Sequence, residues 1–523
     1  MKAPTALGSS MFFPSAFSLF TMLVYILMSY GGIRSPDSEV VFRTTEAIAT
    51  RGTFAVTEEL SWKGFGLTRG TDDRLYSLFG PAQAVAAVPF YGLARLINST
   101  EWHERAVESV PVSHYVGNGV IEYAKGEIPE DLTSHALRSL ACLFNPFVSS
   151  LCVFVFYLLV RALTQSDLSA RLTTILFSFG TLMLPYSGTF FSEPLATFFV
   201  MLSLHFLIKN SVSSDPFRRR HAVNVTASGL SLGLATATHL TAILYVPFFC
   251  FYAVYAVYAL HDNSELSKRR IAAIGGLFIL GVSAILVILA VYNHTRFGGV
   301  LETGRTAQSG ATPTYGIWVT PWRGLWALLI SSGKGLLLYC PAILLSIVGW
   351  KHFHTRHRVL AVIIVGAAAL RILFIASRSD WHGGFCLGPR YMVMLVPLLI
   401  LPVGEFINNC IQGRNAKSLW AVGLCTLVCI AQQLYFSLGE IFLFLHNFKW
   451  QAARKGVDIF EDNFLYVNWQ FSPLLYLLEG KRAPFFLTSL PVSNYVLWSG
   501  MVLCAGVLLF SVYYRLLRKH LVK

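Results

Sequence analysis

Long apolar runs recur along almost the whole chain, and most of them match the thickness of a lipid bilayer. A helix needs about 20 apolar residues to cross the hydrocarbon core, whereas strands of a membrane barrel alternate over about ten positions. Only 13% of the residues are charged, against about a quarter in ordinary soluble domains. The sequence therefore predicts an all-α polytopic membrane protein with about twelve spans, at residues 11–32, 138–160, 172–187, 191–208, 224–240, 242–260, 271–292, 335–350, 359–377, 391–410, 418–446 and 493–514.

The charges of the short loops predict the orientation. Loops on the cytoplasmic side of membrane proteins carry an excess of Lys and Arg. The loops and termini that we place there hold 19 basic and 4 acidic residues, which leaves 22 basic and 23 acidic residues elsewhere. Both termini are therefore expected in the cytoplasm, and the first run, which has no small-residue cleavage site before Arg34, is expected to stay as an anchor. The formal net charge of +14 thus needs no nucleic-acid partner.

Two further apolar segments, 78–97 and 318–332, are expected to lie on the outer leaflet as juxtamembrane helices. If residues 78–97 crossed the membrane, every later loop would change sides and the basic clusters would face outward. Pro81 and Pro89 are also expected to limit a continuous span there. Large outer segments then remain at 33–137, 293–334 and 447–492, with a short one at 378–390. They hold most of the polar residues outside the spans, so we expect the functional site in these outer segments.

An acidic pair, Asp37 and Glu39, stands shortly after the first predicted span. Charges this close to the hydrocarbon boundary are unfavourable unless they pair, bind a metal or take part in chemistry. The same residues in Ser-Pro-Asp-Ser-Glu also suit the first turn of a helix, where acids are favoured. Both interpretations, helix capping and a reactive site, are open at this point.

Other polar groups gather at the ends of predicted spans. Glu193 suits the first turn of a helix or a site, and Lys334 suits an interfacial anchor or a site. Arg305 follows a polar stretch with a glycine. The densest group is Asp380-Trp-His-Gly-Gly-Phe-Cys-Leu-Gly-Pro-Arg-Tyr391, which combines an irregular backbone with a titratable group and an anion ligand. An aromatic belt with an interfacial arginine is the alternative for that segment.

The order of several motifs resembles the GT-C superfamily of polytopic glycosyltransferases, especially bacterial enzymes related to protein O-mannosyltransferases and to the aminoarabinose transferase that acts on lipid A. The resemblance runs from Met11 to about Tyr391. It rests on Asp37-x-Glu39, Tyr76-Ser-Leu-Phe-Gly-Pro-Ala-Gln83, Ser192-Glu-Pro194, Arg296-Phe-Gly298, Ser332-Gly-Lys-Gly-Leu336, Trp381-His-Gly-Gly384 and Gly388-Pro-Arg-Tyr391. Residues 1–410 are accordingly expected to form a GT-C-like catalytic region with its first outer loop at 33–137, and residues 411–523 a C-terminal region with its outer loop at 447–492.

The resemblance implies an inverting transfer of a sugar from a polyprenyl-phosphate donor to an acceptor on the extracytoplasmic side. It implies that Asp37 is the general base and that Glu39 orients the acceptor or helps to hold a divalent cation. Two carboxylates alone make a thin site for Mg²⁺ or Mn²⁺, so a cation requirement stays open. The expected substrate-binding residues for the phosphate are Arg390 and Lys334 first and Arg74 and Arg305 next. Tyr76, Trp381 and His382 are expected around the sugar, and Tyr391 and Glu193 are further substrate-binding candidates with no assigned part of the substrate.

The expected partners are a polyprenyl-phosphate-linked sugar, membrane lipids and a lipid, glycan or protein acceptor. The family likeness places the chain in a bacterial plasma membrane with its active site facing outside. A transporter or flippase of lipid or solute is the alternative function, and a catalytically silent scaffold is a third. Transporters concentrate polar residues near the bilayer midplane, whereas most candidates here lie at the predicted outer boundary, with His239 and Arg371 as the main exceptions.

Overall fold

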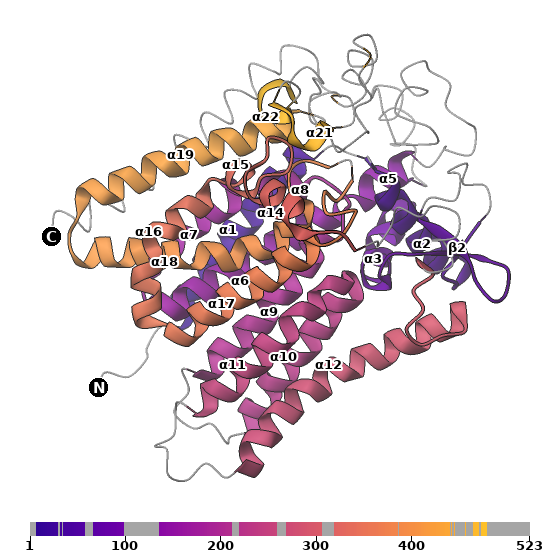
Figure 1. The fold of residues 1–523 in the computed structure, drawn as a ribbon, viewed down its shortest axis with the longest axis horizontal. Coiled ribbons are helices and arrows are strands. Elements are labelled where there is room, and N and C mark those ends of the chain that lie inside the picture. The colour runs from indigo at the N-terminus through magenta and orange to yellow at the C-terminus, as the bar shows by residue number, and fades with distance from the viewer. Residues whose placement is uncertain are drawn as a thin grey trace.

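The computed structural model describes residues 7–29, 32–33, 35–57, 66–98, 135–211, 219–258, 268–305, 318–384, 386–439, 441, 444, 456, 464–469 and 472–477. Within these residues the chain is mainly helical (Figure 1), and three short strands form one antiparallel sheet in the order β1-β3-β2. The elements are α1 Leu7–Met28, α2 Pro36–Arg51, β1 Ala55–Val56, β2 Leu67–Arg69, β3 Leu75–Ser77, α3 Pro81–Asn98, α5 His135–Ala141, α6 Phe144–Thr164, α7 Asp167–Phe179, α8 Met183–Ser187, α9 Glu193–Ser211, α10 Arg219–Thr238, η3 Leu240–Tyr245, α11 Val246–Tyr258, α12 Lys268–Phe297, α14 Pro321–Ile330, α15 Leu336–Tyr339, α16 Ala342–Arg356, α17 Arg358–Ala376, η4 Arg390–Leu395, α18 Val396–Gln412, α19 Ala416–Leu438, α21 Phe464–Val467 and α22 Pro473–Tyr476.

The helical polytopic class is confirmed. Eleven of the predicted spans coincide with one helix or with two consecutive short helices, and the span at 493–514 lies outside the described residues. Among those residues, six helices are long and apolar enough to cross a membrane, and the total of twelve stays a prediction. The six are Met11–Met28, Phe144–Thr164, Ile271–Phe297, Arg358–Ala376, Arg390–Gln412 and Ala416–Leu438.

The two segments that we expected to be juxtamembrane are helices, α3 and α14. Pro81 begins α3, as a residue without a backbone N–H can at a first helical position. Pro89 lies inside α3, and the helix continues past it. Because α3 packs along α2 and α5, tertiary contacts hold the helix together across the proline.

The start of α2 shows why its two acids lie where they do. Ser35 caps the helix with a hydroxyl that accepts from the Ser38 N–H, and Pro36 occupies the first position. Asp37 and Glu39 then fall in the first turn, where the helix dipole favours acids. Side chains two positions apart on a helix do not face each other, so the cap directs the two carboxylates to different sides of α2.

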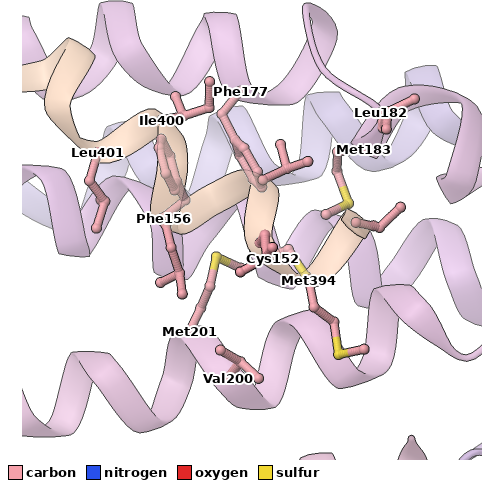
Figure 2. Close-up of a cluster of buried hydrophobic side chains, with 14 of the residues drawn as sticks. Cys152, Phe156, Phe177, Leu182, Met183, Val200, Met201, Met394, Ile400 and Leu401 are labelled. Carbon is pink, nitrogen blue, oxygen red and sulfur yellow. The ribbon is translucent and has the colours of Figure 1, made fainter. Parts of the chain in front are cut away.

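The main core lies where α6, α7, α9 and α18 meet, with η4 beside them. Figure 2 shows Phe156 and Phe177 in one cluster with Cys152, Val200, Met201, Met394 and Ile400. The two phenyl rings stack with their centroids 4.2 Å apart. Elsewhere in the bundle, α10 and α12 approach so closely that a Cβ on Gly229 would lie 2.1 Å from the Phe278 carbonyl oxygen. Small residues allow this backbone contact, as is common between membrane helices.

A second apolar cluster joins α2, α3 and α5 to the start of α6 through Phe42, Tyr91 and Phe144. Figure 1 shows α2, α3, α5 and β2 gathered at one end of the helical bundle. Within the sheet, Thr68 and Ala55 both pair with Tyr76, so β3 is the central strand. This cluster places the first turn of α2 beside a cavity at that end of the bundle.

Candidate functional site

A cavity of about 430 Å³ lies between the first turn of α2 and the ends of several bundle helices. Its walls come from the start of α9, the junction of α10 with η3, the last turn of α12, the end of α17 and the start of η4. Chain segments far apart in the sequence therefore meet there. The charged residues of the lining are Asp37, Glu193, Arg296, Arg305, Arg378 and Arg390. With four arginines against two carboxylates, the cavity suits an anionic ligand.

An arginine joins the two carboxylates of the cavity. Nη1 of Arg390 donates to Oδ2 of Asp37 at 2.6 Å, and Nε of Arg390 lies 3.2 Å from Oε1 of Glu193. The Asp37 side chain is 19% exposed and that of Glu193 only 2%. The other oxygen of Glu193, Oε2, is buried and has no hydrogen-bond partner among the described residues, and the same holds for Arg390 Nε.

The backbone before η4 positions Arg390. Gly388 has φ +58°, and a Cβ at this residue would lie 2.6 Å from the Tyr339 ring, so a side chain would meet both backbone strain and a steric clash. The residue after Arg390 is held by Arg371 of α17. Arg371 donates to the Tyr391 carbonyl oxygen at 2.9 and 2.8 Å and to the Thr241 carbonyl oxygen at 3.2 Å. The buried Arg371 therefore ties η4 to η3 and is not itself part of the lining.

The other three arginines of the cavity differ in the hydrogen bonds and ion pairs that they form. Arg296 donates to the Ser77 carbonyl oxygen at 2.7 Å, which joins α12 to β3, and to Asn293 within α12 at 3.0 Å. Arg378 forms two hydrogen bonds with Asp380, at 2.7 and 2.8 Å. Arg305 is exposed and has no hydrogen bond or ion pair with any described residue. Arg305 is therefore the cavity cation with the most freedom to take a ligand.

Glu39 lies apart from the cavity, on the opposite side of α2. It accepts from Arg138 of α5 at 3.0 and 2.5 Å and from Arg43 at 3.0 Å. The side chains of Glu39 and Arg138 are 1% and 0% exposed. Burial alone would raise the pKa of Glu39, but Arg138 and Arg43 together hold that pKa below its ordinary value. Glu39 thus joins α2 to α5 and does not converge with Asp37.

Lys334, Trp381 and His382 also lie outside the cavity lining. Lys334 is buried, and its Nζ donates to the carbonyl oxygens of Gly384 and Cys386, each at 2.9 Å. His382 accepts from the Gly384 N–H at 2.9 Å. Burial, followed by the nearby Lys334, lowers the pKa of His382 to about 3. These side chains build the irregular loop before Arg390.

Packing against the C-terminal region completes this loop. The His382 ring stacks on Tyr466 of α21 with centroids 4.3 Å apart, and Trp381 meets the same tyrosine edge-on. Lys334 Nζ lies 5.0 Å from the centroid of that ring. The segment that the sequence marked as richest in candidate ligands is thus a folded support, and its last residues, Arg390 and Tyr391, are the ones that reach the cavity.

Tyr76 and Arg74 of the first outer segment are likewise absent from the lining. Tyr76 is buried, and its hydroxyl donates to Asp72 at 2.7 Å. Burial and the neighbouring Asp72 raise the pKa of Tyr76. The Arg74 side chain is 66% exposed and lies 3.8 Å from Asp72.

The cavity also contains residues that we did not predict as ligands. His239 stands at the break between α10 and η3, with Nδ1 2.8 Å from the Thr241 hydroxyl, and its ring meets Tyr391 at 5.7 Å. Arg296 and Arg378 join the lining as well. A histidine inside an apolar run was the signal that could have marked His239, since intramembrane polar residues are functional candidates by default.

The donor set does not suit a cation held jointly by the acidic pair. Asp37 is bound to Arg390, and Glu39 is bound to two arginines on the other side of α2. Among the described residues, no three His, Cys, Asp or Glu side chains come together as a possible metal site. We therefore derive no step of the reaction through a metal.

Comparisons with known proteins bear on the family. Residues 113–297 match the model of the dolichyl-phosphate-mannose-protein mannosyltransferase family. This range contains Glu193, His239 and Arg296 and ends before Arg390. A comparison with curated protein sequences finds no match.

Several solved structures are similar to this chain. ArnT from Cupriavidus metallidurans bound to undecaprenyl phosphate is 14% identical, with 92% of this chain and 76% of that chain covered and a TM-score of 0.45. The S. cerevisiae protein O-mannosyltransferase Pmt1-Pmt2 complex bound to the sugar donor is 13% identical, with 55% and 34% covered and a TM-score of 0.37. The apo oligosaccharyltransferase of Archaeoglobus fulgidus is 10% identical, with 87% and 60% covered and a TM-score of 0.44.

This chain thus spans about a third of the yeast chain and three-fifths of the archaeal chain. Identities this low and TM-scores below 0.5 do not carry a functional assignment. The match to the mannosyltransferase family model covers residues 113–297, about a third of the chain. It shows what this part of the chain is similar to, and the activity of the whole chain is proposed below.

Proposed function

We propose that the chain transfers a sugar, with inversion, from a polyprenyl-phosphate donor to a hydroxyl of an acceptor outside the cytoplasm. The observation that carries this proposal is the Asp37–Arg390 pair of 2.6 Å in a cavity that also holds three more arginines. A carboxylate fixed by a guanidinium, beside a site for an anion, has the groups that such a displacement needs.

The reaction is a single displacement at the anomeric carbon. Asp37 accepts the proton of the acceptor hydroxyl while that oxygen attacks the anomeric carbon. The bond between this carbon and the phosphate oxygen breaks, and its electron pair leaves with the lipid phosphate. The hydrogen bond from Arg390 to Oδ2 fixes the rotamer of Asp37, and it leaves Oδ1 for the incoming hydroxyl.

The leaving phosphate gains a negative charge as the bond breaks, so a cation near it stabilises the transition state. Arg305 is our choice for this role, since it lines the cavity and no described residue pairs with it. Arg390 is already paired with two carboxylates, and Lys334 already donates hydrogen bonds to two carbonyl oxygens. The phosphate position is therefore proposed at Arg305, with Arg378 beside it.

An apolar wall of the same cavity suits the lipid tail of the donor. Leu240, Ile243, Leu289 and Phe374 line this side, and Leu240 and Ile243 are 51% and 40% exposed. Apolar side chains that face a bilayer beside a cationic site would hold the first prenyl units while the phosphate reaches the arginines. This arrangement supports a lipid-linked donor, and the polyprenyl class of that lipid rests on the family likeness.

The proposed sidedness rests on the charges of the loops, and the proposed bacterial membrane rests on the family likeness. The cavity includes the first turn of α2, which follows the first span, and the positive-inside distribution places that end outside the cytoplasm. A bacterial plasma membrane and an acceptor that is a lipid, a glycan or a protein hydroxyl are parts of the same proposal. The solved ArnT complex contains undecaprenyl phosphate, so this lipid is a reasonable first probe.

A transfer assay tests the proposal. The protein in nanodiscs is given undecaprenyl phosphate carrying a radiolabelled hexose, from a small panel of hexoses, with envelope membranes of the expression host as acceptor. We expect wild-type protein to release label from the lipid. Asp37→Asn should lower this rate by about 10²–10⁴-fold, the usual contribution of a general base, while donor binding stays near the wild-type level.

Asp73→Asn is the matched control. It also removes one carboxylate from the first outer segment, but the Asp73 side chain is 87% exposed and pairs with Arg69 at the surface. This variant should retain wild-type turnover. Near wild-type turnover of Asp37→Asn with every active donor would show that Asp37 is not the base.

A further inference from the structure

Two buried polar atoms of the cavity lack partners and complement each other. Oε2 of Glu193 is an acceptor, Nε–H of Arg390 is a donor, and neither forms a hydrogen bond with a described residue. Both side chains line the cavity, and they are joined by the 3.2 Å contact between Arg390 Nε and Glu193 Oε1. An unpaired buried acceptor is unfavourable for folding, so a ligand that supplies the missing bonds explains why the fold keeps one here.

A hydroxyl group matches this pair better than other small groups. It donates one hydrogen bond and accepts others, so a single oxygen could give its proton to Glu193 and accept from Arg390. A phosphate, by contrast, carries only acceptors at neutral pH and would be repelled by the Glu193 carboxylate. The pair therefore favours the sugar over the phosphate of a lipid-linked donor.

The position of the pair relative to the base limits which hydroxyl it can hold. The same guanidinium binds Asp37 through Nη1 and approaches Glu193 through Nε. These two nitrogens belong to one rigid planar group, so a hydroxyl held at Nε lies next to the place where Asp37 meets the acceptor oxygen. On a pyranose, the hydroxyl nearest to the reacting carbon is the one on the adjacent carbon.

We propose that Glu193 and Arg390 form a subsite for the donor-sugar hydroxyl that is adjacent to the anomeric carbon, with Glu193 as a specificity residue. This inference rests on the proposed function and deepens it. It implies that the enzyme distinguishes sugars that carry a free hydroxyl at that carbon from sugars that lack it. Arg390 then links recognition of the sugar to the orientation of the base.

Direct binding measurements test the subsite apart from catalysis. Wild-type, Glu193→Gln and Glu193→Ala proteins in nanodiscs are titrated with undecaprenyl phosphate and with the undecaprenyl-phosphate hexose that wild type uses. We expect both variants to bind the bare lipid phosphate within about twofold of wild type. Their affinity for the sugar-bearing lipid should fall by about 10- to 100-fold, the loss expected when one charge-assisted hydrogen bond is removed.

A donor with a deoxy carbon beside the anomeric carbon completes the design. Wild type should bind this analogue as weakly as Glu193→Ala binds the normal donor, and Glu193→Ala should not discriminate between the two. Asp73→Asn, an exposed site, is the charge-removal control, and thermal stability of each variant is recorded to confirm folding. Equal losses of affinity for both lipids, or no loss for the sugar-bearing lipid, would overturn the subsite.

Failure of the proposed function would look different. If wild-type protein binds neither lipid and releases no label from any donor of the panel, the glycosyl transfer proposal itself fails. If wild type transfers sugar but binds the deoxy donor as tightly as the normal donor, and the Glu193 variants bind the normal donor like wild type, only the subsite fails.

Discussion

Replacing Glu39 by Gln should destabilise the protein without removing a group that contacts substrate. Glu39 accepts three hydrogen bonds from Arg138 and Arg43, and Arg138 is completely buried. Glu39→Gln preserves the shape of the side chain but leaves the Arg138 charge buried without its counter-ion. Removing one partner of a buried ion pair typically costs about 3–5 kcal/mol.

That energy converts into a measurable melting shift. At about 2.1 cal/mol/K per residue, complete unfolding of a chain of 523 residues has an entropy of about 1.1 kcal/mol/K, so Tm should fall by about 3–5 °C. Thermal unfolding in nanodiscs, followed by intrinsic fluorescence, measures the shift. Asp73→Asn, which breaks only the exposed pair with Arg69, should change the stability by less than about 1 kcal/mol.

Turnover and donor affinity, measured on the same samples, separate a structural role from a catalytic one. Because Glu39 holds α2, its loss should lower turnover in parallel with the melting temperature. Replacing both partners, as in Glu39→Leu with Arg138→Met, should recover part of the stability, since an apolar pair avoids the desolvation of two charges. A Glu39→Gln protein with the wild-type Tm but without turnover would refute this reasoning and would return Glu39 to the reaction.

Three further outcomes follow from the geometry. Lys334→Met leaves the Gly384 and Cys386 carbonyl oxygens without their donor, so it should lower Tm more than it weakens binding of undecaprenyl phosphate; the reverse order would place Lys334 at the phosphate. The pKa of His382 is lowered to about 3, so the folded protein keeps this ring neutral. His382 therefore stabilises the fold fully above its ordinary pKa of 6.5 and progressively less as the pH falls below that value; thermal unfolding of wild type and His382→Asn between pH 4 and pH 8 should converge at the acidic end, and parallel curves would contradict this. Gly229→Val should abolish folded protein because its Cβ would meet the Phe278 carbonyl oxygen at 2.1 Å, whereas Gly276→Ala, which meets nothing within 4 Å, should express and melt like wild type.

The sequence was a good guide to the helices because each span must satisfy its own backbone in lipid. Without water in the hydrocarbon core, every N–H and C=O pairs within the helix, so length and hydropathy locate a span without knowledge of its neighbours. Eleven predicted spans coincide with helices for this reason. Pro89 does not interrupt α3, because packing of α3 against α2 and α5 supports the helix around it.

Candidate residues were harder to place, because residue type indicates what a side chain can do but not what surrounds it. Lys334, His382 and Trp381 have the chemistry of ligands, yet they hold a loop against Tyr466. His239 looked like an intramembrane exception and lines the cavity. No local pattern distinguishes these two outcomes, since both depend on contacts between segments far apart in the chain.

The sequence by itself determined the membrane class, the helical spans, the asymmetry of charge and the acidic start of α2. These properties depend on hydropathy, on loop charge and on capping by Ser35, all of which act over a few residues or over one span. Only the tertiary structure decided that Asp37 faces the cavity while Glu39 faces Arg138. Successive polar groups on a helix diverge, and Arg390 reaches Asp37 from 353 positions away, so the site exists only once the bundle has brought α2, α9 and η4 together.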